Sequence, residues 1–288
     1  MKKIINISMF LITIDFLRVI VGFVIEKMTG SSDKITLAII YGLTAYILDI
    51  PMIYYFIRNN KKKKYFVTKE KMNIGSFIGC FALMALITAI IGIISLVFKL
   101  KIESNDNSIL LDYPTLYVNM TLFSTIIIAP IIEEMIFRGV IMNDLKEYGY
   151  KTAIIINSVL FGLAHTEIEK VIITIFLGII FSYVAYRYSL RYSVLLHMVW
   201  NLNSSMGSIF YYNKMPDEMI IWFVAVLSLA LIVISIFGII KKKYIMIFSI
   251  FRLSIEDKKN MTLFLKNNAI FLIMISVIFF TNFYLWYL

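Results

Sequence analysis

Long apolar stretches, separated by short polar linkers, make up most of the chain. They carry helix formers and glycines where a barrel strand would alternate apolar and polar residues, so they predict α-helices long enough to cross a membrane. We therefore expect an all-α fold: a polytopic transmembrane helical bundle of eight to nine spans, preferably nine. The predicted spans are 5–26, 35–57, 75–98, 116–137, 152–166, 171–186, 192–210, 219–240 and 268–288.

The composition and the charge pattern agree with a membrane protein. Hydrophobic residues make up 60% of the 288 residues and charged residues only 16%, whereas soluble domains carry about 25% charged residues. The net charge of +10 would also suit nucleic acid, but most lysines and arginines gather in linkers on one side of the predicted spans. This positive-inside pattern places the N-terminus in the cytoplasm and the C-terminus outside, with anionic lipid and no nucleic acid beside the basic linkers.

Three regions are expected along the chain. Residues 1–115 supply N-terminal transmembrane helices, residues 116–210 hold the chemically distinctive side chains, and residues 211–288 supply C-terminal transmembrane helices. Within the last region, the segment near 244–267 is too polar to span and predicts an amphipathic helix at the cytoplasmic membrane surface. The lipid bilayer is the expected partner, and the richness in Ile, Lys and Asn favours a bacterial plasma membrane.

The fourth predicted span contains two adjacent acids, Glu133 and Glu134, and then Arg138. An ionised side chain in an apolar helix costs about 2.5–3.5 kcal/mol on insertion scales, so such residues face a protein interior or a wet cavity. Glu134 and Arg138 share a helix face, whereas Glu133 points about 100° away, so the two acids are expected to have different roles. Pro130 removes the amide that would bond the carbonyl of Ile126, which predicts a bend just before the acids.

Both histidines of the chain lie in later apolar segments: His165 ends the sequence Phe-Gly-Leu-Ala-His, and His197 precedes Asn201 by one helical turn. Two carboxylates and two histidines suit hydrolysis, because a buried acid can act as a general base on water and a histidine can pass the proton on. A histidine with an asparagine amide can also donate hydrogen bonds to an oxyanion. The same residues could instead bind zinc, with Glu133, His165 and His197 as the ligands.

His165 falls near the outer end of the predicted fifth span, whereas Glu133 and His197 lie close to the cytoplasmic ends of theirs. To bring the three together, the fifth segment must begin deeper in the cytoplasm, or the fifth and sixth segments must form a hairpin that does not cross fully. Neither segment reaches the ~20 residues of an ordinary span.

Three motifs occur in order on these segments: EE-x-x-x-R from Glu133 to Arg138, F-x-x-x-H from Phe161 to His165, and H-x-x-x-N from His197 to Asn201. The pattern closely resembles the CPBP family of intramembrane proteases, also called the CAAX-protease and bacteriocin-processing (Abi) family. The resemblance covers roughly residues 116–210. Each motif is loose alone, but the three together use both histidines of the chain.

The resemblance implies a membrane-embedded endopeptidase whose site opens toward the cytoplasm. By that analogy the catalytic residues are Glu133 for water activation, His165 for proton transfer, and His197 with Asn201 for the oxyanion. The supporting residues are Glu134, Arg138 and Phe161. Family members are described both as metalloproteases and as glutamate-dependent enzymes, so zinc stays open and no cofactor is certain.

The expected substrate is a peptide or a protein tail delivered at the cytoplasmic membrane face. The family's eukaryotic substrates are prenylated CAAX tails, which are not expected in a bacterium. Maturation of a secreted peptide and self-immunity to a bacteriocin are the contexts that the resemblance implies.

Two other classes of function stay open. A proton- or ion-coupled transporter could use the same glutamates and histidines as a relay, although it has no need of an asparagine one turn after His197. A non-catalytic membrane partner could keep the fold without turnover. Glu134 and Arg138 could also be a structural ion pair, and the histidines could form interhelical hydrogen bonds worth about 0.6–2 kcal/mol.

Overall fold

The computed structural model describes residues 69–98, 115–165 and 168–269, together with Tyr54, Arg58, Leu272, Ile273 and Ser276. The predicted spans at 5–26, 35–57 and 268–288 lie largely outside these residues, as do the two chain ends and their predicted orientation. Within the described residues every element is helical and there is no strand, which confirms the all-α class.

Ten α-helices are described: α3 (Ile74–Val97), α4 (Thr115–Phe123), α5 (Ala129–Glu134), α6 (Met142–Leu145), α7 (Tyr150–Leu163), α8 (Ile168–Arg187), α9 (Leu190–Tyr212), α10 (Asp217–Ile240), α11 (Ile245–Phe248) and α12 (Ile255–Asn267). Two π-helical segments, Ser124–Ile128 and Met135–Ile141, join α4, α5 and α6 into one continuous rod. Short 3-10 turns, Lys146–Tyr148 and Ser249–Phe251, follow α6 and α11.

Within the part of the chain that the structure describes, four helical stretches are long and apolar enough to cross a membrane: Ile74–Val97, Tyr117–Tyr148, Lys170–Arg187 and Asp217–Ile240. They correspond to the third, fourth, sixth and eighth predicted spans, so spanning helices are supported whereas the total of nine is not confirmed. The predicted fifth and seventh spans are also helical, as α7 and α9, but α7 is shorter and α9 is more polar.

The fourth span continues well past residue 137, where the sequence predicts its end. The helix runs on to Tyr148 because no proline interrupts this stretch, and Asn143 Nδ2 donates to the carbonyl oxygen of Gly139 at 2.8 Å. It ends where Gly149 adopts a φ of +89°, a backbone conformation available mainly to glycine. α7 begins at the next residue, so the predicted linker is a helical extension and a single-residue break.

α7 and α8 pack antiparallel through two close approaches. A Cβ atom on Gly162 would lie 2.4 Å from Cγ1 of Ile175, and a Cβ atom on Gly178 would lie 3.2 Å from Cα of Ser158. Small residues at such crossings let helix backbones come together in membranes. Since α7 has 14 residues, fewer than the ~20 needed to cross, the pair forms a hairpin with one arm too short to span.

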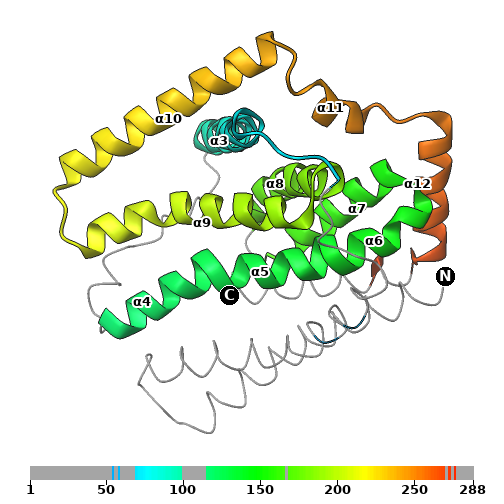
Figure 1. Cartoon of the computed structure of the whole chain (residues 1–288), viewed down its shortest axis with the longest axis horizontal. Helices are drawn as coiled ribbons and strands as arrows, with labels where there is room; N and C mark the ends of the chain where they lie inside the picture. Colours follow the sequence, from blue (N-terminus) through cyan, green and yellow to red (C-terminus); the bar gives the residue numbers. More distant parts are fainter. Residues whose placement is uncertain are drawn as a thin grey trace, which may run out of the picture.

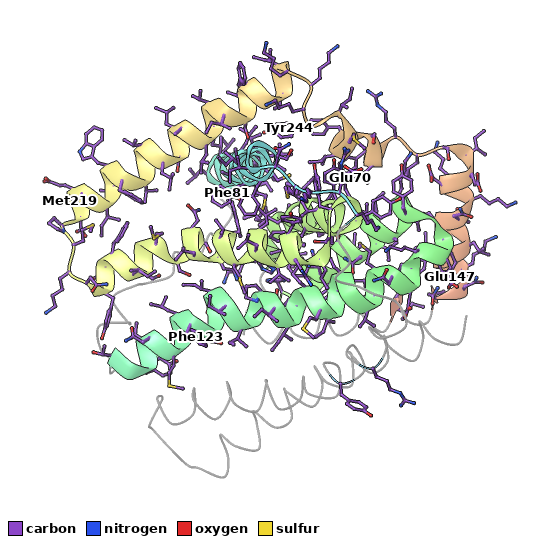
Figure 2. The ribbon with its side chains drawn as sticks, in the orientation of Figure 1. Glu70, Phe81, Phe123, Glu147, Met219 and Tyr244 are labelled. Atoms are coloured by element: carbon purple, nitrogen blue, oxygen red, sulfur yellow. The ribbon has the colours of Figure 1, made fainter. Side chains whose placement is uncertain are left out.

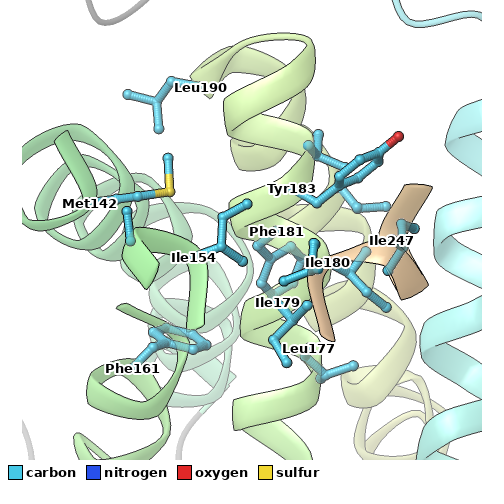
Figure 3. Packing of buried hydrophobic residues seen from close by; sticks show 14 of the residues in the cluster. Met142, Ile154, Phe161, Leu177, Ile179, Ile180, Phe181, Tyr183, Leu190 and Ile247 are labelled. Atoms are coloured by element: carbon cyan, nitrogen blue, oxygen red, sulfur yellow. The ribbon is translucent and has the colours of Figure 1, made fainter. Parts of the chain in front are cut away.

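The arrangement of the helices places α9 at the centre. In Figure 1 the rod of α4, α5 and α6 runs along one side of α9, and α3 with α10 lies on the other side. The apolar core gathers between α5, α7, α8 and α9. Figure 3 shows Phe161 of α7 and Phe181 of α8 within this core.

The segment near 244–267 is helical in two pieces, α11 and α12. Before α11, Tyr244 packs against α3, where its hydroxyl donates to the carbonyl oxygen of Gly79 at 3.0 Å (Figure 2). α12 begins with a capping box in which Ser254 and Asp257 bond each other's backbone amides. Its location at a membrane surface stays a prediction.

Candidate active site

α5 carries both acids in one helical turn between the two π-helical segments. Pro130 is the second residue of α5 and has no amide to donate, and the π-helical segment Ser124–Ile128 lies directly before α5, whereas the predicted bend stays a prediction. π-helical turns are frequent at functional sites. The two acids differ in exposure, because Glu134 is completely buried whereas 32% of the Glu133 side chain is exposed.

Glu134 accepts hydrogen bonds from three side chains. Arg138 Nη1 donates to its Oε1 at 2.9 Å, and Ser193 Oγ donates to its Oε2 at 2.6 Å. Nδ1 of His197 lies 3.1 Å from Oε1. A buried carboxylate is tolerated when it is paired and fully hydrogen-bonded, so this set of donors accounts for an ionised Glu134 in the interior.

Arg138 is also fully buried and lies among aromatic rings. Its guanidinium carbon is 4.2 Å from the ring centroid of Phe161 and 5.4 Å from that of Phe181, distances typical of cation–π interactions. Its Nη2 donates to the carbonyl oxygen of Gly178 at 3.3 Å. Arg138 therefore neutralises Glu134 and connects α5 to the α7–α8 hairpin.

His197 lies between the two glutamates. Its Nδ1 faces Glu134, and its Nε2 is 3.8 Å from Oε2 of Glu133. The ring stacks on Phe181 with centroids 4.5 Å apart. Because an ionised carboxylate can only accept, Nδ1 must carry the proton of its bond to Glu134. Nε2 is thus the nitrogen that faces the exposed acid.

His165 reaches this cluster through Phe161. The ring centroid of Phe161 is 5.2 Å from that of His165 and 5.9 Å from that of His197. His165 lies just beyond the end of α7, where its Nδ1 is 3.0 Å from the carbonyl oxygen of Phe161. The short α7 therefore brings His165 to within one aromatic ring of His197, although His165 follows α7 and His197 is on α9.

Asn201 lies one turn beyond His197 on α9 and faces the first π-helical segment. Its Nδ2 donates to the carbonyl oxygen of Thr125 at 2.9 Å. An asparagine amide has two donor hydrogens, so this bond orients the side chain and leaves a second hydrogen. The structure thus brings Glu133, Glu134, Arg138 and His197 together, with His165 and Asn201 at the edges of the cluster.

Four contributors were missed by the sequence reasoning: Ser193, Phe181, Gly178 and Thr125. Ser193 had a usable signal, because it precedes His197 by four residues and therefore shares its helix face. The others had none. Gly178 and Thr125 act through backbone carbonyls, and Phe181 is one of 23 phenylalanines, so only the tertiary packing of α8 and of the segment Ser124–Ile128 singles them out.

The fit of a zinc ion to these residues is incomplete. Structural zinc sites use four protein ligands and catalytic sites three. Glu133 and His197 could supply two, but among the described residues no group of three or more His, Cys, Asp or Glu side chains is arranged to hold a metal ion.

The fold and the cluster define a helical membrane protein with a buried glutamate–histidine site. Residues 115–203 match the family model described as type II CAAX prenyl endopeptidase Rce1-like, which is a model of the CPBP family. The match contains all three motifs and confirms the predicted resemblance. The CPBP family is a protease family. Together with four apolar helices among the described residues that are long enough to cross a membrane, the match indicates an integral membrane protein. No curated protein and no solved structure matches the chain.

Proposed function

We propose that this protein is an intramembrane endopeptidase that hydrolyses a peptide bond with a water molecule activated by Glu133. The observation that carries the proposal is the pairing of a partly exposed carboxylate with Nε2 of His197 at 3.8 Å. The neighbouring acid, Glu134, is buried and engaged with Arg138. Only Glu133 is therefore both accessible and close to a second group that can exchange protons, as a general base requires.

In the proposed reaction Glu133 carries the proton, and His197, Asn201 and His165 assist. Glu133 removes a proton from water, and the resulting hydroxide attacks the carbonyl carbon of the scissile bond. The oxyanion accepts hydrogen bonds from the free amide hydrogen of Asn201 and from Nε2–H of His197, a nitrogen that takes its proton from bulk water before the attack and keeps it through the cycle. Such donors are typically worth about 2.7–4 kcal/mol each. The proton held by Glu133 then reaches the leaving amine, and His165 assists that transfer.

The surroundings of the reacting groups support this division of roles. The Glu134–Arg138 pair and the rings of Phe161 and Phe181 exclude water from one side of His197. Electrostatic interactions are stronger in such a dry environment. We infer no step through a metal, because the described residues gather only two candidate ligands, and zinc is kept as one arm of the experiment below.

The proposed substrate is a peptide or protein tail that reaches the site at the cytoplasmic membrane face. Maturation of a secreted peptide and self-immunity to a bacteriocin remain the proposed contexts. The family description names a CAAX prenyl endopeptidase, so a prenylated tail belongs among the peptides to be tried.

Peptide release by the purified protein tests the proposal. Membrane-anchored peptides, with and without a prenyl group, are incubated with the wild type, Glu133→Gln and Glu147→Gln, and products are measured by mass spectrometry. Glu147 is the matched control because it is an exposed glutamate near the end of the same rod. We expect cleavage by the wild type and Glu147→Gln and none by Glu133→Gln. A chelator that abolishes cleavage would restore zinc to the mechanism.

Equal product from the wild type and Glu133→Gln, or no product with any peptide, would contradict the proposal. The transporter alternative predicts a different result: pH-dependent uptake into vesicles that Glu133→Gln abolishes. The same two preparations can be tested for both activities.

A further inference from the structure

Ser193 is buried next to the site, at a position that none of the three family motifs includes. It lies in the first turn of α9, four residues before His197, and is completely inaccessible to solvent. Its hydroxyl oxygen is 2.6 Å from Oε2 of Glu134 and 3.0 Å from the carbonyl oxygen of Phe181. A buried hydroxyl placed between two acceptors on other helices is not explained by packing alone.

The single proton of the hydroxyl can go to only one of these acceptors. A charged acceptor forms a stronger and shorter bond than a neutral one, and Glu134 is both ionised and nearer. Ser193 therefore donates to Oε2 of Glu134. A serine within an α-helix can bond the carbonyl four residues earlier in its own helix, whereas the hydroxyl of Ser193 meets acceptors on two other helices.

The bond controls how the carboxylate of Glu134 is oriented. Arg138 and His197 both meet Oε1, and the last side-chain torsion of glutamate is intrinsically broad. With Ser193 holding Oε2, the plane of the carboxylate is set at both ends. Without it, Oε2 would be buried with no side-chain donor, and the carboxylate would turn away from the ring of His197 to share its oxygens with Arg138.

We propose that Ser193 is a positioning residue of this site, which acts through Glu134 to hold His197 with Nδ1–H on the carboxylate and Nε2 toward Glu133. For its kinetic consequence the inference rests on the proposed peptidase function. The predicted orientation of His197 does not depend on that function, so the role of Ser193 and the peptidase function can be tested separately.

The presence of only two histidines in the chain makes a direct test practical. In protein labelled with ¹⁵N-histidine, NMR resolves the imidazole nitrogens, and a His165→Gln background assigns the remaining signals to His197. We expect a single form with Nδ1 protonated in the wild type and in Ser193→Thr, which retains the hydroxyl. In Ser193→Ala we expect a mixture of tautomers. Ser158→Ala is the control, because Ser158 is equally buried but bonds its own helix at Ile154.

Kinetics supply the second measurement. On the peptide that the wild type cleaves fastest, Ser193→Ala is expected to lower kcat about tenfold or more, with KM within twofold, and Ser193→Thr is expected to recover most of the loss. A tenfold change in rate corresponds to about 1.4 kcal/mol, within the range for a hydrogen bond to a charged group. A purely structural role predicts equal unfolding losses for Ser193→Ala and Ser158→Ala and no change of tautomer.

Unchanged His197 nitrogen signals in Ser193→Ala would overturn the inference, whatever the activity. If the wild type cleaves nothing, the proposed function fails while the NMR result still decides the role of Ser193. If Ser193→Ala does not fold, Ser193→Thr is compared with Ser193→Cys, whose thiol is a weak donor of similar size. The inference then requires a wild-type tautomer for Thr and a mixture for Cys, and identical spectra would refute it.

Discussion

Glu133 and Glu134 are neighbours in the chain and approach opposite nitrogens of one imidazole ring. Oε2 of Glu133 is 3.8 Å from Nε2 of His197, and Oε1 of Glu134 is 3.1 Å from Nδ1. The offset of about 100° between successive residues of a helix makes this possible, because the ring of His197 fits between the two side chains. One acid is partly exposed and the other is buried against Arg138, so in the proposed reaction Glu133 is the base and Glu134 is the orienting partner.

Loss of charge at the two acids should therefore affect different properties. Glu134→Gln leaves Arg138 without an ionic partner in the interior, and removing one member of a buried pair typically costs about 3–5 kcal/mol. Glu133→Gln removes a partly exposed charge, and we expect its thermal unfolding to stay close to that of the wild type while peptide release is lost. Unfolding temperatures in the same detergent, measured beside cleavage, give both quantities.

The double variant Glu134→Gln/Arg138→Met provides the control for this prediction. It removes both buried charges, so part of the lost stability should return while activity stays low. If Glu133→Gln unfolds as easily as Glu134→Gln, the division between the two acids is wrong.

Much of the fold was predictable from hydropathy, because each long apolar stretch must satisfy its own backbone as a helix. α3 and α10 begin within two residues of their predicted starts. The extension of the fourth span to Tyr148 was not predictable in this way. Arg138 and Lys146 look like the start of a linker in sequence, and only their contacts with Glu134 and Asn143 show that the helix continues.

In the site, too, contacts within one helix were predictable and contacts between helices were not. The proximity of Glu134 to Arg138 follows from a four-residue spacing on one helix, and local geometry is enough to predict it. The contacts of Glu134 with His197 and Ser193 depend on how α5 packs against α9, and no local pattern encodes that packing. Ser193 could have been noticed from its spacing to His197, but a serine in an apolar helix usually bonds its own backbone.

Asn201 offers a test of oxyanion stabilisation. We expect Asn201→Ala to lower kcat by about 10²- to 10³-fold, the typical loss for one such donor, with little change in KM, since the donor acts on charge that develops in the transition state. Asn213→Ala is the matched control: Asn213 caps the end of the same helix, where its amide bonds the carbonyl oxygen of Ile209. Similar kcat values for the two variants would exclude this role for Asn201.

Asp257, outside the four apolar stretches, should make the stability of α12 depend on pH. The backbone amide and the hydroxyl of Ser254 donate to its carboxylate at 2.8 Å each, with a further contribution from Lys151 at 3.2 Å. These bonds hold the pKa of Asp257 below its ordinary value of 3.8. Because the folded-state pKa is lowered, the stabilisation is complete above the unfolded-state value of about 3.9 and is lost as the pH falls through the folded-state value.

Unfolding temperatures of the wild type and Asp257→Asn, compared between pH 7 and pH 3, test this linkage. We expect Asp257→Asn to be less stable at pH 7 and the difference to shrink toward pH 3. Glu256→Gln changes the exposed acid beside it and should follow the wild type. A difference between wild type and Asp257→Asn that stays constant with pH would mean that the carboxylate charge does not stabilise α12.

Adding one methyl group at Gly162, as in Gly162→Ala, should push α7 and α8 apart and disturb the nearby site. A Cβ atom there would lie 2.4 Å from Cγ1 of Ile175 and 2.9 Å from the carbonyl oxygen of Val171. The carbonyl belongs to the backbone, so α8 must move, and overpacking of this kind typically costs about 1–3 kcal/mol. The ring of Phe161, one residue earlier, contacts both His165 and Arg138, so the displacement reaches the glutamate–histidine cluster.

Gly92→Ala is the matched control, because a Cβ atom at Gly92 of α3 meets no atom of the described residues within 4 Å. Alanine favours a helix over glycine by up to about 1 kcal/mol, so Gly92→Ala should be as stable as the wild type or more so, with unchanged cleavage. Gly162→Ala should unfold at a lower temperature and cleave more slowly. If both variants gain stability and keep full activity, α7 and α8 do not need this close approach. The contact of Phe161 with His165 would then not be needed for cleavage.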